Sequence, residues 1–151
     1  MAIVRLAREA DIPRIIELYR ELAITTAPAE EQRSPSPDDY RRVFAEIKAM
    51  PGYQLVVVEH EGVVVGTLEL LIAPNLAHGG LPWAVVENVV VDHRYQGQGL
   101  GKKLMDYAVE QASKAGCYKI SLSSNIKRHE AHEFYRSLGF TISAHSFSLY
   151  F

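Results

Sequence analysis

The sequence has little cysteine, no long apolar run and no excess of charge of either sign. Its single cysteine, Cys117, cannot form an internal disulfide, so a disulfide-stapled scaffold is excluded and a reducing, cytoplasmic location is expected. No apolar run approaches the roughly 18 residues that cross a membrane. The N-terminus carries charge by Arg5, so no signal peptide is expected. With 16 basic and 18 acidic residues, the chain lacks the positive field on which non-specific nucleic-acid binding relies.

What is present is an ordinary patterning of apolar and polar residues over 151 positions, which predicts a single domain, residues 1–151. Periodicity predicts strands at 2–6, 55–59, 63–72, 83–91 and 118–123, with one or two closing strands within 140–151. It predicts helices at 11–22, 39–50, 100–116 and 130–138, and loops at 25–37 and 74–82. The order β-α-α-β-β-β-α-β-α-β-β predicts an α/β fold with a mixed sheet and helices on its faces.

Local signals mark the ends of several of these elements. Asp11, before Ile12-Pro13, is expected to cap the first helix, and Ser36 or Asp38 the second. The tripeptide at 60–62 contains a glycine and predicts a hairpin turn between two strands.

A glycine-rich segment lies between the most β-branched strand and the helix that follows it. Gly97, Gly99 and Gly101 allow close approach of a ligand, and a helix start adds unpaired N–H groups and partial positive charge. These features favour an anion site suited to phosphate over a turn that merely caps the helix. The spacing matches neither the dinucleotide-binding fingerprint, because position 102 is lysine, nor the P-loop, because position 96 is glutamine.

Two motifs carry a resemblance to a known family. Gln96-Gly97-Gln98-Gly99-Leu100-Gly101 follows a valine-rich strand, and Asn125 precedes Phe134-Tyr135 and Leu138-Gly139-Phe140. With these motifs and this element order, the chain resembles the GNAT superfamily of acyl-CoA N-acyltransferases over nearly its full length. The stretch 86–122 is similar to glucosamine-6-phosphate N-acetyltransferases, and the stretch 123–140 to aminoalkylphosphonate N-acetyltransferases. The resemblance implies a GNAT-like fold, acetyl-CoA as cosubstrate and acetylation of a small amine.

The resemblance also implies how coenzyme A is held. The backbone of Val89, Val90 and Val91 is expected to hold the pantetheine arm and the thioester carbonyl, as an extended ligand adds to a strand edge. The backbone amides from Gln96 to Lys102 are expected to bind the pyrophosphate. Lys102, Lys103 and Arg94 could add positive charge that attracts a phosphate of the cofactor. The alternative is that all three are ordinary solvated surface side chains.

Asn125 is expected to contact the coenzyme A arm, as in the family. Its spacing to Tyr135 is ten residues, longer than the common family spacing, which opens this role to Arg128 or His129.

Tyr135 is expected to be the general acid. Expulsion of coenzyme A produces a thiolate, and a phenol with a pKa near 10 can protonate or hydrogen-bond it. The alternative is a half-buried aromatic on an amphipathic helix, and Phe134 is interpreted as core. His132 lies on roughly the same face and is interpreted as a surface histidine.

Glu87 is the candidate base, because the nucleophile must be a free amine and most amines are protonated at neutral pH. Strand alternation is expected to place Glu87 on one face with Val89 and Val91, and a carboxylate in so apolar a strand is costly without a partner. A strand-end glutamate at the sheet surface is the alternative, and Glu69 is a second candidate.

The expected reaction is transfer of an acetyl group from acetyl-CoA to a small-molecule primary amine by direct attack in a ternary complex, without metal or covalent intermediate. The alternatives are a protein or peptide acetyltransferase and a non-catalytic acetyl-CoA-binding regulator. Substrate selection is expected from the two loops and the C-terminal segment, with Arg33, Lys127 and Arg128 as candidate contacts for a phosphate or phosphonate on the acceptor. The apolar, alternating C-terminus is expected to pair with a second subunit in a homodimer.

Overall fold

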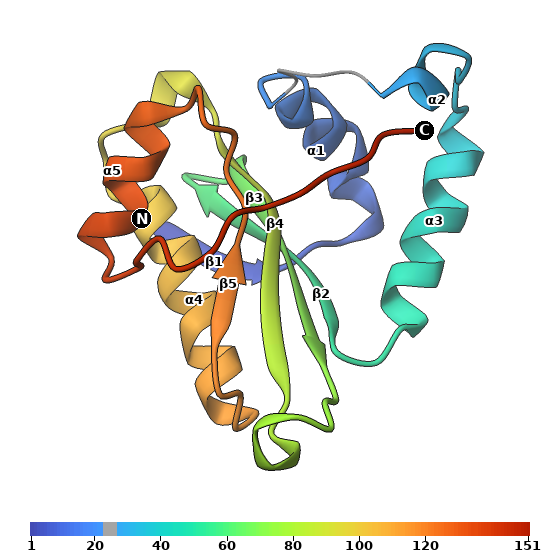
Figure 1. Ribbon diagram of the computed structural model, residues 1–151. Coiled ribbons are helices and arrows are strands. Elements are labelled where there is room, and N and C mark those ends of the chain that lie inside the picture. The colour runs from blue at the N-terminus through green and yellow to red at the C-terminus, as the bar shows by residue number, and fades with distance from the viewer. Residues whose placement is uncertain (23–26) are drawn as a thin grey trace.

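The computed structural model describes residues 1–22 and 27–151 (Figure 1). Its strands are β1 (Ala2–Leu6), β2 (Tyr53–His60), β3 (Val63–Ala73), β4 (Trp83–Val91) and β5 (Ile120–Leu122). Its α-helices are α1 (Ile12–Tyr19), α2 (Pro28–Glu31), α3 (Pro37–Ala49), α4 (Leu100–Lys114) and α5 (His129–Ser137). Short 3-10 turns occupy Glu9–Asp11, His78–Gly80 and His93–Tyr95. The predicted α/β fold with a mixed sheet is confirmed.

The sheet has the order β1-β2-β3-β4-β5, in which the first four strands are antiparallel neighbours and β5 runs parallel to β4. β2 and β3 are joined by a two-residue turn, Glu61-Gly62, in which both residues have positive φ (49° and 81°). Such a turn matches the twist of the flanking strands. The predicted hairpin is confirmed, one residue tighter than the sequence indicated.

α4 covers one face of the sheet. Its Leu100, Leu104 and Ala108 recur on one side of the helix and are at most 3% exposed, and they pack on Val56, Leu68 and other apolar residues of the strands. Burial of each such large side chain contributes about 1.5–3 kcal/mol to stability. The start of α4, which the glycine-rich segment precedes, is therefore anchored by Leu100.

α1 and α3 cover the upper part of the opposite face. Ile15 and Leu18 of α1 and Phe44 of α3 pack on Leu55 and Val57 of β2. Ser36 caps α3: its hydroxyl accepts from the Asp39 N–H at 3.2 Å, while the Asp39 carboxylate accepts from the Ser36 N–H at 2.8 Å. The expectation of Ser36 as one possible cap is thus confirmed.

Asp11 precedes α1 as expected, but its carboxylate does not cap that helix. It accepts instead from the Arg5 guanidinium at 2.7 Å and from the Arg8 N–H at 2.7 Å. The charged donor on β1 competes successfully for the carboxylate because a charge-assisted hydrogen bond is stronger than one from a neutral amide.

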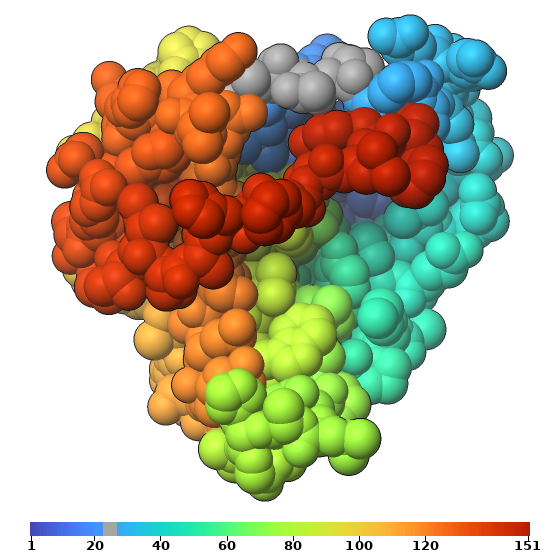
Figure 2. Space-filling view, in the orientation of Figure 1, coloured from blue at the N-terminus to red at the C-terminus, as the bar shows by residue number. Residues whose placement is uncertain are grey.

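The C-terminal segment, residues 140–151, differs from the prediction. It contains no strand in the part of the chain that the structure describes, and it crosses the front of the molecule as an extended tail (Figures 1 and 2). The Ala29 N–H donates to the Phe151 carbonyl at 2.8 Å, and Ser146 contacts Ser123. The alternating side chains therefore accompany an extended conformation, but a strand also requires a ladder of backbone hydrogen bonds to a neighbour, and the described structure has none along the tail.

Two further expectations are adjusted. The strand expected at 118–123 is confirmed but covers only Ile120–Leu122. The loop expected at 25–37 begins outside the described residues, and its described part contains the short helix α2. None of the helices in the described ranges has the length and apolar character that a membrane crossing requires.

Candidate active site

β4 and β5 pair over only a short stretch and then part. Ala84, Val85 and Val86 lie opposite Ile120, Ser121 and Leu122, and the pairing ends there. On its other side β4 continues to pair with β3 as far as Val91. Val90 and Val91 are therefore held by β3 on one side, and on the other side no strand of the described chain pairs with Val89–Val91. Such an edge is the arrangement to which an extended amide-bearing ligand can add.

A cavity of about 600 Å³ lies at this divergence, and we call it the cleft. Its walls come from β4, β5, α5, the end of α1 and alternate residues of the C-terminal tail. Its lining includes Glu87, Asn88, Val89, Asn125, Arg128, Tyr135, Ser146, Ser148 and Tyr150. The sequence-predicted residues of β4 and of the C-terminal motif thus meet around one space.

The glycine-rich segment after β4 has the backbone that an anion site needs. Gly97 and Gly99 have φ of 81° and 77°, and a Cβ added to either would have no neighbour within 4 Å. Gly99 is the N-cap of α4, so the first N–H groups of the helix follow it directly. Positive φ, open space and a helix N-terminus coincide here, in agreement with a backbone cradle for phosphate.

Gly101 serves a different purpose from the other two glycines. A Cβ at this position would lie 3.2 Å from the ring of Phe134. Its lack of a side chain lets α5 approach the start of α4. Phe134 is therefore a packing residue, as expected, and it ties the cradle to the helix that carries Tyr135.

The side chains at the edges of this segment are already engaged. The Gln96 amide donates to the Val91 carbonyl at 3.1 Å, which folds the segment back on the end of β4. Lys102 pairs with Asp106 at 2.6 Å on the exposed side of α4. Gln98 is exposed at the tip. Any contact of the cradle with a phosphate therefore depends chiefly on backbone amides.

Tyr135 lies on α5 and lines the cleft. Its ring packs edge-on against Phe134 and Phe140, at centroid distances of 5.2 and 6.2 Å. Burial raises the pKa of its phenol, and the positive charge of Arg128 opposes that rise. A phenol held in this way stays protonated at neutral pH, which a proton donor requires.

Asn125 and Arg128 shape the turn that leads into α5. The Asn125 carboxamide oxygen accepts from the Lys127 N–H at 2.9 Å, and its carbonyl accepts from the Arg128 N–H at 3.0 Å. The Arg128 guanidinium donates to the carbonyl of Leu22 at 2.9 Å, at the end of α1. Both residues line the cleft, and Arg128, the residue before α5, is joined to the turn that follows α1.

The face that Glu87 occupies differs from the expectation. Asn88 has a positive φ of 53°, and the register with β3 shifts between Thr67 and Glu69. This bulge interrupts the alternation of β4. Val89 and Val91 pack toward α4, whereas Glu87 points to the opposite face, where it lines a second cavity. Glu87 therefore does not share a face with the two valines, although it also borders the cleft.

Glu69, only a second candidate in the sequence, is the centre of a hydrogen-bond cluster. Its carboxylate accepts from the hydroxyls of Tyr19 and Tyr53, each at 2.7 Å, and from the Asn88 amide at 3.1 Å. Burial, followed by the charge of Glu69, raises the pKa of Tyr19. The cluster fixes the bulge next to Glu87. Neither tyrosine was identified beforehand, because nothing local in the sequence links α1 and β2 to this glutamate.

Glu69 and Glu87 face each other across the paired strands. Burial raises the pKa of Glu87, and the negative charge of Glu69 adds to that rise. A carboxylate with a raised pKa accepts a proton more readily near neutral pH than an ordinary one.

The second cavity, which we call the sheet-face cavity, has a volume of about 200 Å³. It lies on the sheet face that α1 and α3 leave uncovered, and it is lined by Tyr53, Glu69, Leu71, Trp83, Val85 and Glu87. Glu87 lines both cavities, so its side chain lies on the boundary of each.

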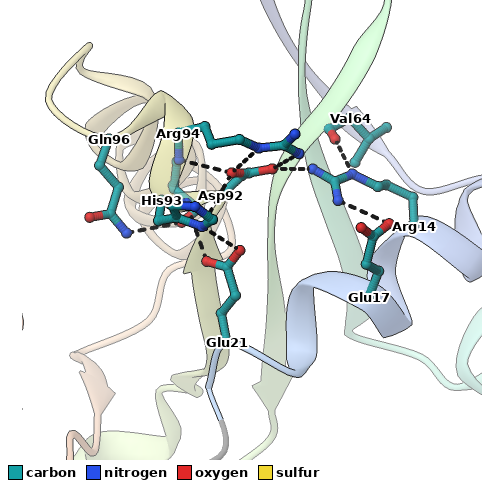
Figure 3. A network of polar contacts seen from close by, with 9 residues as sticks. Arg14, Glu17, Glu21, Val64, Asp92, His93, Arg94 and Gln96 are labelled. Carbon is teal, nitrogen blue, oxygen red and sulfur yellow. Dashed lines mark hydrogen bonds and ion pairs between the residues drawn. The ribbon is translucent and has the colours of Figure 1, made fainter.

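A network centred on Asp92 joins the end of β4 to α1 (Figure 3). The Asp92 side chain is 1% exposed and accepts hydrogen bonds from Arg14 and from Arg94, the latter at 2.7 Å. Arg14 also donates to the Val64 carbonyl at 2.9 Å. Hydrogen bonds from Arg94 first, and then from Arg14, hold the pKa of Asp92 well below its usual range. The network fixes the backbone immediately before the glycine-rich segment.

Asp92 also lies near Glu21 and His93, and one ligand atom of each comes within 4.8 Å of the others. Glu21 is engaged by His93, through its N–H at 3.2 Å and its ring Nδ1 at 3.1 Å. The two guanidiniums on Asp92 oppose a cation at this point.

The other candidate contacts lie apart from these cavities. Arg33 and Lys127 are exposed, and neither lines the cleft or the sheet-face cavity. His132 is bound to the Asn125 carbonyl at 2.8 Å. Burial raises the pKa of the Cys117 thiol, as expected for an unreactive cysteine packed at the edge of the core.

Comparison with known proteins gives a consistent result. Residues 6–140 match the model of the acetyltransferase (GNAT) family. A glucosamine 6-phosphate N-acetyltransferase of Trypanosoma brucei brucei is 34% identical over 138 residues, which cover 90% of this chain and 86% of the relative. An aminoalkylphosphonate N-acetyltransferase of Salmonella typhimurium is 33% identical over 110 residues, 72% of this chain and 70% of the relative.

The crystal structure of glucosamine-6-phosphate N-acetyltransferase from Arabidopsis thaliana superposes with a TM-score of 0.85 at 26% identity, covering 100% of this chain and 99% of that one. Both resemblances noted in the sequence are therefore confirmed.

The Asp92 network generates a prediction about stability. Asp92→Asn is expected to lower the unfolding free energy at pH 7 by about 2–3 kcal/mol, because it removes charged hydrogen bonds from a buried acceptor. The folded-state pKa of Asp92 is depressed, so its stabilisation is present above about pH 4 and is lost as pH falls through the folded-state pKa. Urea unfolding should therefore show the difference between the two proteins narrowing below pH 4. Asp106→Asn, at an exposed ion pair, is the control and should change stability by less than about 0.5 kcal/mol.

Proposed function

This chain belongs to the GNAT family of acetyltransferases, and we propose that it transfers an acetyl group from acetyl-CoA to the primary amine of a small molecule by direct attack in a ternary complex. The observation that carries the proposal is the unpaired edge of Val89–Val91 beside a cleft that Glu87 and Tyr135 both line. One residue able to accept a proton and one able to donate a proton border the same space, next to an edge that can hold an acyl carrier.

The residues present fit acetyl-CoA as a cosubstrate. Gly97 and Gly99 hold backbone N–H groups in the open cradle at the start of α4, which suits a pyrophosphate. The edge of Val89–Val91 suits the amides of a pantetheine arm. Asn125 and Arg128 line the cleft with Val89 and offer further polar contacts there. When bound, the thioester supplies an activated acetyl group.

Glu87 would take the proton from the incoming ammonium, directly or through one water. The free amine then forms the new C–N bond at the acetyl carbon as the C–S bond breaks, and the amine's second proton leaves to solvent. Holding both reactants in this geometry supplies much of the rate. Glu69, fixed by Tyr19 and Tyr53, supports the bulge that aims Glu87 and keeps its pKa raised.

Tyr135 would donate its proton to the departing sulfur. Its ring packs edge-on against Phe134 and Phe140, and these contacts help to hold the side chain at the cleft wall. The phenolate left behind is reprotonated from solvent before the next turnover.

The proposal is tested by thiol release from acetyl-CoA over a panel of small amines and lysine peptides. Turnover with small amines is expected. Turnover with peptides alone would instead establish a peptide acetyltransferase, and tight coenzyme A binding without any turnover would establish a non-catalytic regulator.

We further propose a homodimer that forms through the C-terminal tail. Phe147, Leu149 and Phe151 point outward and are 94%, 80% and 84% exposed, while the alternate residues line the cleft. A segment with an apolar outer face and an unpaired backbone is suited to pairing with another chain. Sedimentation is expected to give the mass of two chains, and Leu149→Ser to shift it toward one. A single-chain mass for the unmodified protein at working concentration would refute the dimer.

Gly99→Glu is expected to abolish binding of coenzyme A, because a carboxylate would enter the phosphate cradle. Gly62→Glu is the matched control, since Gly62 has nearly the same φ (81° against 77°) and equally open surroundings but lies in the β2–β3 turn. Titration calorimetry should show no heat for the first variant and an unchanged dissociation constant for the second. Retained affinity in Gly99→Glu would contradict the cradle.

Tyr135→Phe is expected to lower kcat by about 100-fold or more, the contribution typical of a general acid. Affinity for coenzyme A should change little, because the ring and its packing remain. Steady-state kinetics measures the change in kcat, and titration calorimetry measures the affinity for coenzyme A. Tyr150→Phe, which removes another hydroxyl from the cleft wall, is the matched control and should retain most of the rate.

The raised pKa of Glu87 generates a prediction about pH. A base must be ionised, so kcat is expected to fall as pH drops through an ionisation above the usual glutamate pKa. Glu69→Gln removes the neighbouring negative charge and should move this ionisation to lower pH, and Glu87→Gln should abolish it. Glu110→Gln, on the exposed side of α4, should leave the profile unchanged. An unchanged profile in Glu87→Gln would remove Glu87 from the mechanism.

A further inference from the structure

We propose that the sheet-face cavity holds the side group of the acceptor, and that the acceptor is a small primary amine with an apolar or aromatic side group and no phosphate. This inference rests on the proposed acetyltransferase activity and names its substrate class. The occupant of the cavity is thus a small cationic amine, with its nitrogen at Glu87 and its side group on the sheet.

The strand registers arrange the cavity in rows. Tyr53, Leu71 and Val85 lie side by side on three adjacent strands, and the next row on the same face carries Glu69 and Glu87. Rows on one face are two residues apart, about 7 Å along the strand. An amine at Glu87 therefore has an apolar row within the reach of an aromatic ring on a two-carbon linker.

The volume suits such a group. Engineered apolar cavities of roughly 150 Å³ bind benzene. The sheet-face cavity, at about 200 Å³, has room for one ring and a short linker. Trp83, two residues before Val85 on β4, adds an aromatic wall.

The apolar walls have no structural partner in the described part of the chain. Leu71, Trp83 and Val85 are only half-buried, whereas Leu55 and Val57 on the same face of the sheet are covered by α1 and α3. The lower part of β4 remains visible beneath the C-terminal tail in the space-filling view (Figure 2). Half-exposed apolar residues gathered beside a polar site are typical of ligand binding.

The charges of the cavity exclude phosphate and favour a cation. Glu69 and Glu87 oppose each other across the strands, a repulsive pair that a bound ammonium group relieves. No lysine or arginine is among the cavity's described lining residues. A phosphate there would meet two carboxylates without the cationic donors that phosphate recognition uses.

Trp83 is the chain's single tryptophan, so its fluorescence reports occupancy of the cavity independently of turnover. Phenethylamine, hexylamine, glucosamine 6-phosphate and 2-aminoethylphosphonate are titrated in the presence of coenzyme A. The two apolar amines are expected to change the emission saturably, with dissociation constants at least tenfold lower than those of the two phosphorus-containing amines. Thiol release with acetyl-CoA should give kcat/KM values in the same order.

Val85→Ser is expected to raise KM for phenethylamine about tenfold, the typical effect of a few lost apolar contacts, and to raise KM for ethylamine much less, because ethylamine has no ring to lose those contacts. Val63→Ser is the matched control: it makes the same exchange at a half-exposed strand valine beside the β2–β3 turn, and both values should stay unchanged.

The possible failures are distinguishable. If phosphorus-containing amines are acetylated with higher kcat/KM than the apolar amines, the substrate class is overturned and the proposed acetyltransferase activity stands. If no amine releases thiol, the proposed function fails and this inference fails with it. If the emission of Trp83 changes with protein concentration but with none of the amines, the cavity belongs to a contact between subunits and the inference is overturned.

Discussion

β4 and β5 pair at only three positions. Every group proposed to act in catalysis lies at or beyond the place where these two strands diverge. Had the two strands paired further, Val89–Val91 would have their backbone groups satisfied within the sheet and the cleft would be closed. The divergence is made possible by the short β5 and by the bulge at Asn88, which redirects β4 while its bonds to β3 persist. Because β4 continues past the end of its pairing with β5, space remains beside β4 in which an extended acyl carrier can bind to the strand edge.

The polar networks on either side of this opening hold it in shape. Asp92 connects the end of β4 to α1 through Arg14, and Arg128 connects the turn before α5 to Leu22 in the turn after α1. A buried carboxylate with two guanidiniums adds little net stability compared with apolar packing, but loss of one member leaves the others poorly solvated. Such pairs are suited to fixing geometry, which a site built from backbone edges and loops requires.

Much of the fold was predictable because the relevant signals are local. The spacing of the apolar residues predicts the helix α4, and the run of valines predicts the strand β4. The spacing of Gly97 and Gly99 predicts the backbone conformation of the segment between them. The bulge at Asn88 was not predicted, because alternation counting assumes an unbroken strand, although an asparagine within a valine run is a signal for positive φ. The hub at Glu69 depends on tyrosines from α1 and β2, and only the folded chain brings these together. The tail at 140–151 was mistaken for strands because its pattern says nothing about whether a neighbouring edge exists.

The contact between Gly101 and Phe134 has a mechanical consequence. Residue 101 sits in the segment proposed to grip one end of the carrier, and Phe134 is the immediate neighbour of the phenol proposed to serve the other end. Since the ring is already 3.2 Å from where a methyl group would stand, any side chain at 101 would have to displace the Phe134 ring. A change at residue 101 would therefore reach the neighbourhood of Tyr135 through one aromatic ring, so the two ends of the proposed carrier site are coupled by direct packing.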